Sequence, residues 1–256
     1  MSTPGSVIHT VESGPETNTV VLLVHGSLDR SAGMARLTRV LQQWVRVVRY
    51  DRRGYGRSWP HPGPFGVGDQ ADDLLRVLDG RRCVAVGHSY GGHPVLASSI
   101  REPERFVGVS VFETPLSWMD WWPSTSAGAA SVEAQTGDAA EAFMRRLIGD
   151  RKWEELPERT RAERRREGEA LQGELGHLRK GAPWRAGDIT VPLLCGHGSR
   201  GMAHHARAMK LLASEVRDAR FVTLEGAGHG APNTHPEQFV DLLVRPHLER
   251  AGISTS

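Results

Sequence analysis

The sequence is poor in cysteine and has no long apolar run. Its 256 residues include only two cysteines, Cys83 and Cys195, which lie in apolar stretches and are expected to be buried free thiols. The longest aliphatic run, residues 20–24, is far shorter than the roughly 20 residues of a membrane-spanning helix. The first residues lack a basic patch followed by an apolar stretch, so no secretory signal is expected. These absences predict a cytoplasmic protein without a membrane partner.

An excess of one charge is also missing. The chain has 32 Lys and Arg residues against 30 Asp and Glu residues, a formal net charge of +2. The most basic run, residues 159–166, is interleaved with glutamates at positions 154, 155, 158, 163, 167 and 169. This mixture indicates a solvated helix face and no nucleic-acid partner. The oligomeric state is left open.

Short apolar runs alternate with helical patterns along most of the chain. Buried strands are expected at residues 19–25, 45–50, 82–87, 106–112, 190–195 and 220–224, with an antiparallel edge strand at 7–11. Apolar residues at helical spacing predict helices at 32–44, 69–78, 90–101, 202–216 and 236–250. This alternation predicts an α/β protein whose mainly parallel sheet carries helices on both faces.

The alternation stops between residues 114 and 185, where no strand pattern is present. A tryptophan-rich stretch is followed by a helical pattern at 141–148 and by the charged residues 157–180. So long a structureless stretch would be unusual in a compact domain. A helical insertion between two strands is therefore expected at residues 115–185, and it is called the inserted segment below.

The most specific motif is Gly87-His88-Ser89-Tyr90-Gly91, a G-x-S-x-G pattern between an apolar strand and a helical pattern. The glycines leave room for a sharp turn. The turn presents the Ser89 hydroxyl at a helix N-terminus, where backbone amides favour developing negative charge. The flanking elements favour a nucleophile over a simple Gly/Ser turn.

A serine nucleophile needs a neighbouring base, and the chain has 12 histidines. His229 lies in a glycine-rich loop after the last strand, where it is either this base or a surface residue. His88 is expected to pack or line the pocket edge, since adjacent residues of such a turn point apart. His204 and His205 could be metal ligands, but no carboxylate or cysteine stands at ligand spacing. Neither a metal nor a cofactor is expected.

In the order of its motifs the chain resembles the α/β-hydrolase fold family over essentially its whole length. His25-Gly26 follows the first long strand, residues 51–58 resemble the family's D-x-R-G-x-G-x-S stretch, and residues 226–230 resemble its late G-x-x-H loop. The inserted segment lies where the family carries its cap, or lid. The resemblance implies an α/β-hydrolase core formed by residues 1–114 and 186–256, with a helical cap at 115–185.

The resemblance also implies an oxyanion hole, in which backbone N–H groups stabilise negative charge on a carbonyl oxygen. One donor would be the amide of Tyr90, directly after the serine. By family position the other would be the amide of Ser27, with Leu28 as second choice.

The acid of the expected triad is missing from its usual place. The family usually carries an Asp after the strand at 190–195, but residues 189–214 contain no Asp or Glu, and Asp188 precedes that strand. A minority of the family takes the acid from the end of the preceding strand, where Glu113 stands. One subgroup of haloalkane dehalogenases shares this relocation, but Ser89 excludes their aspartate-nucleophile chemistry. Glu113 is either the acid or a cap of the junction into the inserted segment.

Together these features imply a serine hydrolase that cleaves a small-molecule carboxylic ester through an acyl-enzyme. A lactone, thioester, amide or carbon–carbon bond would use the same groups. A ligand-sensing relative with slow turnover and a cofactor-free oxygenase or perhydrolase are alternatives. Candidate pocket residues are Leu28, His88, Trp118, Trp121 and Trp122, although the tryptophans could equally form the core of the lid.

Overall fold

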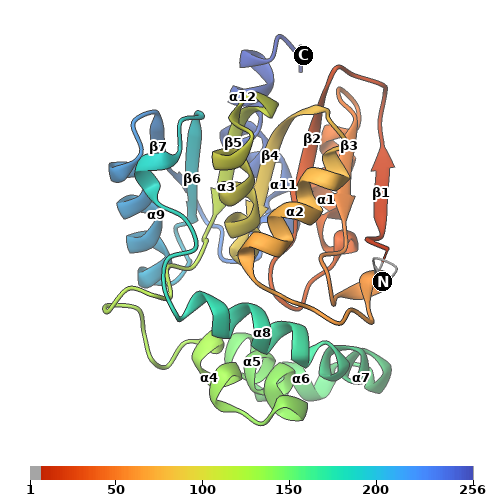
Figure 1. The fold of residues 1–256 in the computed structure, drawn as a ribbon, viewed down its shortest axis with the longest axis vertical. Helices are drawn as coiled ribbons and strands as arrows, with labels where there is room; N and C mark the ends of the chain where they lie inside the picture. The colour runs from red at the N-terminus through yellow and green to blue at the C-terminus, as the bar shows by residue number, and fades with distance from the viewer. Residues whose placement is uncertain (1–6, 256) are drawn as a thin grey trace, which may run out of the picture.

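The computed structural model describes residues 7–255, and in this range seven strands form one sheet in the order β1-β3-β2-β4-β5-β6-β7 (Figure 1). β1 runs antiparallel to β3, and the other neighbours are parallel. The predicted mainly parallel sheet with an antiparallel edge strand is confirmed. The strands are β1 (Thr10–Ser13), β2 (Thr19–Val24), β3 (Val47–Tyr50), β4 (Arg82–His88), β5 (Phe106–Phe112), β6 (Leu193–Gly198) and β7 (Ala219–Leu224).

Three strands start later than the sequence predicts, and one of them, β3, begins at Val47 instead of residue 45. β1 begins at Thr10 instead of residue 7. β6 covers Leu193–Gly198 instead of 190–195, because Pro192 has no N–H for the strand ladder. The pairing of β6 with β7 continues through Gly196 to Gly198. A Cβ atom on Gly196 would lie 2.6 Å from Leu243, so a glycine is required there for close packing.

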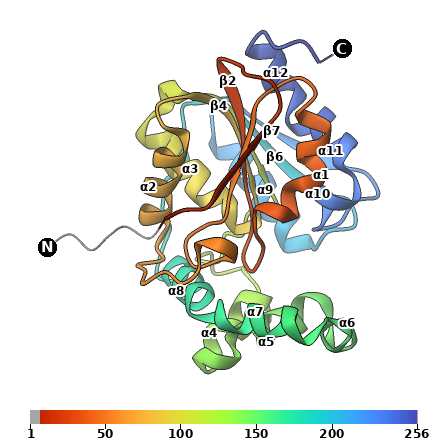
Figure 2. The ribbon, with the colours of Figure 1, turned by 90° about the vertical axis from the view of Figure 1, so that its right-hand side faces the viewer.

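Helices cover both faces of the sheet (Figure 2). Side chains of β2 alternate between two apolar cores: Val20 and Leu22 belong to one, Val21 and Leu23 to the other. The first core includes α2 (Val67–Leu78), α3 (Gly92–Arg101) and α9 (Ala203–Glu215). The second includes α1 (Ala35–Leu41), α10 (Ala231–Thr234), α11 (Pro236–Leu243) and α12 (Arg245–Arg250). Each strand of the centre is therefore buried on both sides.

The last predicted helix, residues 236–250, is divided into α11 and α12. The break lies at Val244, two residues before Pro246. A proline ring has no N–H for the helix and collides with the carbonyl four residues earlier, which explains the break.

The inserted segment contains five α-helices and one short 3-10 helix (Thr136–Asp138) between β5 and β6, and it lies beyond one end of the sheet (Figure 1). Residues 115–126 form turns, and the helices follow: α4 (Ala127–Glu133), α5 (Ala139–Ile148), α6 (Asp150–Glu155), α7 (Glu158–Arg166) and α8 (Gly168–Leu178). Of these, α8 runs nearest to the sheet (Figure 1). That the inserted segment forms a cap domain distinct from the core stays a prediction.

Cys83 and Cys195 are buried free thiols, as predicted. Across residues 7–255, none of the helices combines the length and apolar character needed to cross a membrane. The cytoplasmic location stays a prediction.

Candidate active site

Ser89 occupies a strained turn between β4 and α3. Its φ angle is 53°, in the left-handed region that non-glycine residues rarely adopt. A Cβ atom on Gly87 would lie 2.4 Å from the Cα of Gly92, and one on Gly91 would lie 2.4 Å from the carbonyl oxygen of Val24. The glycines of the motif therefore permit the sharp turn that exposes the Ser89 hydroxyl to a cavity.

Glu113 directly follows β5 and also has a left-handed φ angle, 49°. Its side chain is only 1 % exposed. The Nδ1 atom of His229 donates a hydrogen bond to Glu113 Oε2 at 2.7 Å, and the amide of Gly198 donates to Oε1 at 3.1 Å. The structure thus brings together an acid and an imidazole that are 116 residues apart in sequence. Asp188 instead lies in a 3-10 turn before β6 and is half exposed.

Two further histidines, not singled out as neighbours of the acid by the sequence, surround Glu113. His205 Nδ1 donates to the carbonyl oxygen of Glu113 at 2.9 Å, and His197 Nδ1 lies 3.0 Å from Glu113 Oε1. Burial opposes ionisation of Glu113, but the hydrogen bond from His229 and the nearby imidazoles outweigh it and lower its pKa to about 2. Burial lowers the pKa of His205 to about 3. The site therefore holds an ionised carboxylate beside a neutral imidazole.

The sequence offered no carboxylate at ligand spacing from His205, but in the structure Glu113 lies next to it. Glu113, His205 and His229 offer donor atoms that all lie within 4.8 Å of one another, a spacing that could hold a metal ion. Both imidazole Nδ1 atoms are already hydrogen-bonded to Glu113. Mutual hydrogen bonding therefore accounts for the cluster without an ion.

A cavity of about 520 Å³ separates Ser89 from the inserted segment. Ser27, Tyr90 and His229 line it beside Ser89, so the expected oxyanion residues and the imidazole reach one space. The remaining wall is largely apolar and comes mostly from the inserted segment. Its apolar residues include Pro115, Trp122, Phe143, Leu147, Leu175 and Met202.

Of the five proposed pocket residues, Trp122 lines the cavity, whereas Leu28 and His88 do not. Leu28 is buried in the apolar core. His88 Nε2 donates a hydrogen bond to the carbonyl oxygen of His229 at 2.9 Å, and burial lowers the pKa of His88 to about 3. A neutral His88 thus supports the loop of His229 from behind.

The other two tryptophans are also absent from the cavity wall. Trp118 packs against Trp184 with ring centroids 5.3 Å apart, and Trp121 lies under the guanidinium of Arg207 at 4.3 Å. Both rings pack against other side chains and do not line the cavity above Ser89.

A buried ion pair contacts Ser27, one of the residues that line the cavity. Glu174 on α8 and Arg52 are each 1 % exposed, and Arg52 Nη1 lies 2.6 Å from Glu174 Oε2. The hydroxyls of Ser27 and Tyr55 donate to Glu174 Oε1 at 2.6 and 2.7 Å. The inserted segment therefore contacts the residue expected to supply the second oxyanion donor.

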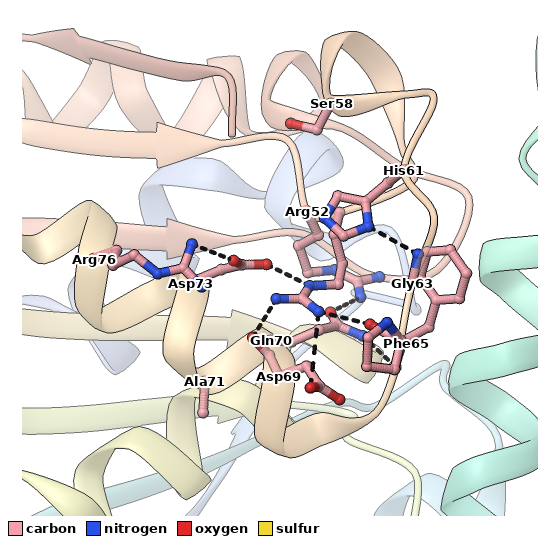
Figure 3. Close-up of polar contacts among 12 residues, drawn as sticks. Arg52, Ser58, His61, Gly63, Phe65, Asp69, Gln70, Ala71, Asp73 and Arg76 are labelled. Atoms are coloured by element: carbon pink, nitrogen blue, oxygen red, sulfur yellow. Dashed lines mark hydrogen bonds and ion pairs between the residues drawn. The ribbon is translucent and has the colours of Figure 1, made fainter. Parts of the chain in front are cut away.

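The loop that carries Arg52 is fixed further by α2. Arg52 Nη1 donates to Gln70 Oε1 at 2.5 Å, and Figure 3 shows the two side chains together. Asp73 on the same helix accepts from Arg53 Nε at 2.6 Å and pairs with Arg76 at 2.9 Å (Figure 3). These contacts hold the 51–58 loop as scaffolding.

Glu167 is a second buried carboxylate of the inserted segment. The charged run around residues 159–166 was expected to form a solvated helix face, and Glu167 departs from that expectation. Glu167 is 1 % exposed; it accepts from the amide of Gly56 at 2.9 Å and from Arg30 at 3.1 Å. Arg159, by contrast, is 90 % exposed. Charge alternation in sequence did not separate the buried glutamate from its exposed neighbours.

The fold and these residues define an α/β hydrolase. A sequence model described as the Alpha/beta hydrolase family matches residues 21–242, and the chain belongs to this family. Family membership supports a hydrolase as the class of enzyme.

Among curated proteins, the chain is 33 % identical over 110 residues to the "Putative carbamate hydrolase RutD" of Caulobacter segnis. That match spans 40 % of this chain and 41 % of the relative, about two fifths of each. The same-named protein of Caulobacter vibrioides is 25 % identical over 258 residues, covering 91 % of this chain and 92 % of the relative.

Among solved structures, the enol-lactonase of Burkholderia xenovorans has a TM-score of 0.71 at 22 % identity and covers 96 % of both chains. At this identity the likeness shows the shared fold.

Proposed function

We propose that this chain is a serine hydrolase that cleaves a carboxylic ester, or a related lactone or thioester, through an acyl-enzyme. The main support is the 2.7 Å hydrogen bond from His229 Nδ1 to the buried Glu113 carboxylate, beside the cavity that Ser89 and His229 line. An imidazole held in this way offers its Nε2 atom as a base.

In the proposed reaction, Ser89 Oγ attacks the carbonyl carbon while His229 Nε2 takes the hydroxyl proton. Glu113 keeps its negative charge and stabilises the imidazolium that forms. The backbone amides of Ser27 and Tyr90 donate to the developing oxyanion. His229 then returns the proton to the leaving group, and water releases the acid from Ser89 by the same steps.

We assign the inserted segment as the lid of this site. Trp122, Phe143, Leu147 and Leu175 all lie in it and line the cavity. An apolar wall opposite the nucleophile suits the hydrocarbon part of an acyl group. The names of the relatives, a carbamate hydrolase and an enol-lactonase, belong to reactions at a carbonyl carbon as well.

The first test is Ser89→Ala, which removes the nucleophilic oxygen and little packing. Hydrolysis of a short-chain chromogenic ester is expected to fall by about 10⁴-fold or more, as after loss of a triad member in other serine hydrolases. A fluorophosphonate probe should label the parent protein and miss the variant.

The matched control is Ser214→Ala, an exposed serine on α9 that should keep both activity and labelling. Labelling that survives in Ser89→Ala would place the nucleophile elsewhere. Tight ligand binding by the parent protein without turnover would favour the sensor alternative.

A further inference from the structure

The cavity above Ser89 is lined by arginines that come from three different parts of the chain. Arg146 lies on α5, Arg179 follows α8, and Arg200 lies in the loop after β6. Among the described residues of the cavity wall, Glu113 is the one carboxylate, and it is buried under histidines. The wall therefore carries several positive charges and a single negative charge that already has partners.

The cavity arginines differ from several arginines of the inserted segment that do not line the cavity. Arg145, Arg161 and Arg165 each form ion pairs with glutamates. Within residues 7–255, no ion pair is found for Arg146, Arg179 or Arg200. In a chain where glutamate is abundant, the cavity arginines are thus left without a counter-charge.

Arg146 is also held in place. Its Nε atom donates to the carbonyl oxygen of Thr125 at 2.6 Å, and Thr125 lines the same cavity. One edge of the guanidinium is occupied by this bond, and other N–H groups are left to bind a ligand. Burial lowers the pKa of His204, which lines the same cavity, so this ring adds no fixed charge of its own.

We propose that the substrate of this site carries a carboxylate, remote from the carbonyl that Ser89 attacks. A guanidinium fork binds a carboxylate through two parallel hydrogen bonds. Like-signed charges around an apolar cavity also raise the local concentration of the opposite ion. The apolar wall takes the hydrocarbon spacer, and the arginines take the acid. This inference rests on the proposed hydrolase function and narrows its substrate to half-esters of dicarboxylic acids and carboxylated lactones.

The test compares two esters that differ in charge and hardly in shape: monomethyl glutarate, which is an anion, and methyl glutaramate, its neutral amide. The parent protein should prefer the anion in kcat/KM by about tenfold or more, as expected for charge-assisted hydrogen bonds. The preference should lie mainly in KM and shrink as salt is added, because salt screens exposed charges.

Each of the variants Arg146→Gln, Arg179→Gln and Arg200→Gln is then measured with both esters. At least one should lower the ratio of the two kcat/KM values several-fold. The control is Arg82→Gln, which changes another exposed arginine at the start of β4, outside the residues that line the cavity; it should leave the ratio unchanged.

The inference is overturned if the parent hydrolyses the amide ester as well as the acid ester, or if all three variants keep the parent ratio. In either case the serine hydrolase proposal stands. If neither ester is hydrolysed and Ser89 resists the phosphonate probe, the proposed function itself fails and the substrate inference falls with it.

Discussion

Two buried carboxylates, Glu113 in the cavity wall and Glu174 in contact with Ser27, differ in the partners that surround them. Glu113, at the end of β5, is contacted by histidines: His229 and His205 hydrogen-bond to it. Glu174, on α8, is contacted by Arg52 and by two hydroxyls. Both side chains are 1 % exposed.

The difference indicates what each carboxylate can do. An imidazole gains and loses a proton near neutral pH, so an acid beside it can assist proton transfer. A guanidinium stays charged at every physiological pH, so an acid beside it forms a permanent contact. We therefore interpret Glu113 as the residue that positions the base and Glu174 as the residue that fastens the inserted segment to the core.

Among substitutions of these two carboxylates, the largest expected effect comes from Glu113→Gln. The amide has nearly the same shape but loses the charge that stabilises a protonated His229. We expect kcat to fall by about 10²–10⁴-fold with little change in KM, because a ground-state ester barely senses the acid. Steady-state kinetics with a chromogenic ester measures both constants.

Asp188→Asn is the control for this prediction, because Asp188 is half exposed and its nearest ion-pair partner is Arg185 at 4.0 Å. It should be nearly neutral. An inactive Asp188→Asn together with a Glu113→Gln variant within a few-fold of the parent would contradict the relocated acid.

Glu174→Gln should act on stability. It leaves the buried Arg52 charge without a counter-charge, a change that typically costs about 3–5 kcal/mol of unfolding free energy. Urea unfolding followed by circular dichroism measures this loss. Glu154→Gln, which breaks exposed ion pairs on α6, should cost about 0–1 kcal/mol. Equal urea midpoints for the two variants would show that the buried Glu174 pair stabilises the protein no more than a surface ion pair does.

Acidification is expected to lower the free energy of unfolding gradually. The pKa of His88 and of His205 is about 3 in the folded protein, against about 6.5 for an unfolded histidine. Below pH 6.5 the unfolded chain binds protons that these folded rings do not. The free energy of unfolding should therefore fall as the pH drops from about 6.5 to 3, by about 1.4 kcal/mol per pH unit for each ring.

Glu113 acts in a lower pH range. Its folded pKa of about 2 lies below the ordinary value of 4.5, so its stabilising contribution is complete above 4.5 and is lost as the pH falls toward 2. Urea titrations at several pH values separate the two ranges. His205→Gln should reduce the slope of the unfolding free energy against pH, between pH 4 and 6, by the amount that corresponds to about one bound proton. An unchanged slope would show that His205 is not the titrating group.

The sequence predicted those parts of the site that depend on local structure. The turn at Ser89 follows from glycines placed between a strand and a helix. Glu113 was selected because residues 189–214 offer no acid, and the structure places it against His229. The turn depends only on the local order of residues, whereas the choice of Glu113 also rests on the resemblance to the α/β-hydrolase family, a minority of which carries the acid at this place.

Contacts between distant segments could not be predicted in this way. Arg52 and Glu174 are 122 residues apart, and Glu174 belongs to a charged stretch that reads as solvated. The same limit explains the tryptophans: side-chain type does not reveal that Trp118 packs against Trp184 while Trp122 faces the cavity. Which member of a similar set is buried depends on packing that a single sequence does not specify.

The inserted segment is held to the core by buried ion pairs at one part of its length and not at another. Glu167 and Glu174, at one edge, reach the loops that hold Arg30 and Ser27, whereas α5 contributes Phe143 and Leu147 to the cavity wall. Substitutions on α5 can therefore reshape the substrate space without removing a fully buried ion pair. Laboratory libraries aimed at a new substrate would best be confined to α5, where the cavity wall can change while the loop of Ser27 keeps its contact with Glu174.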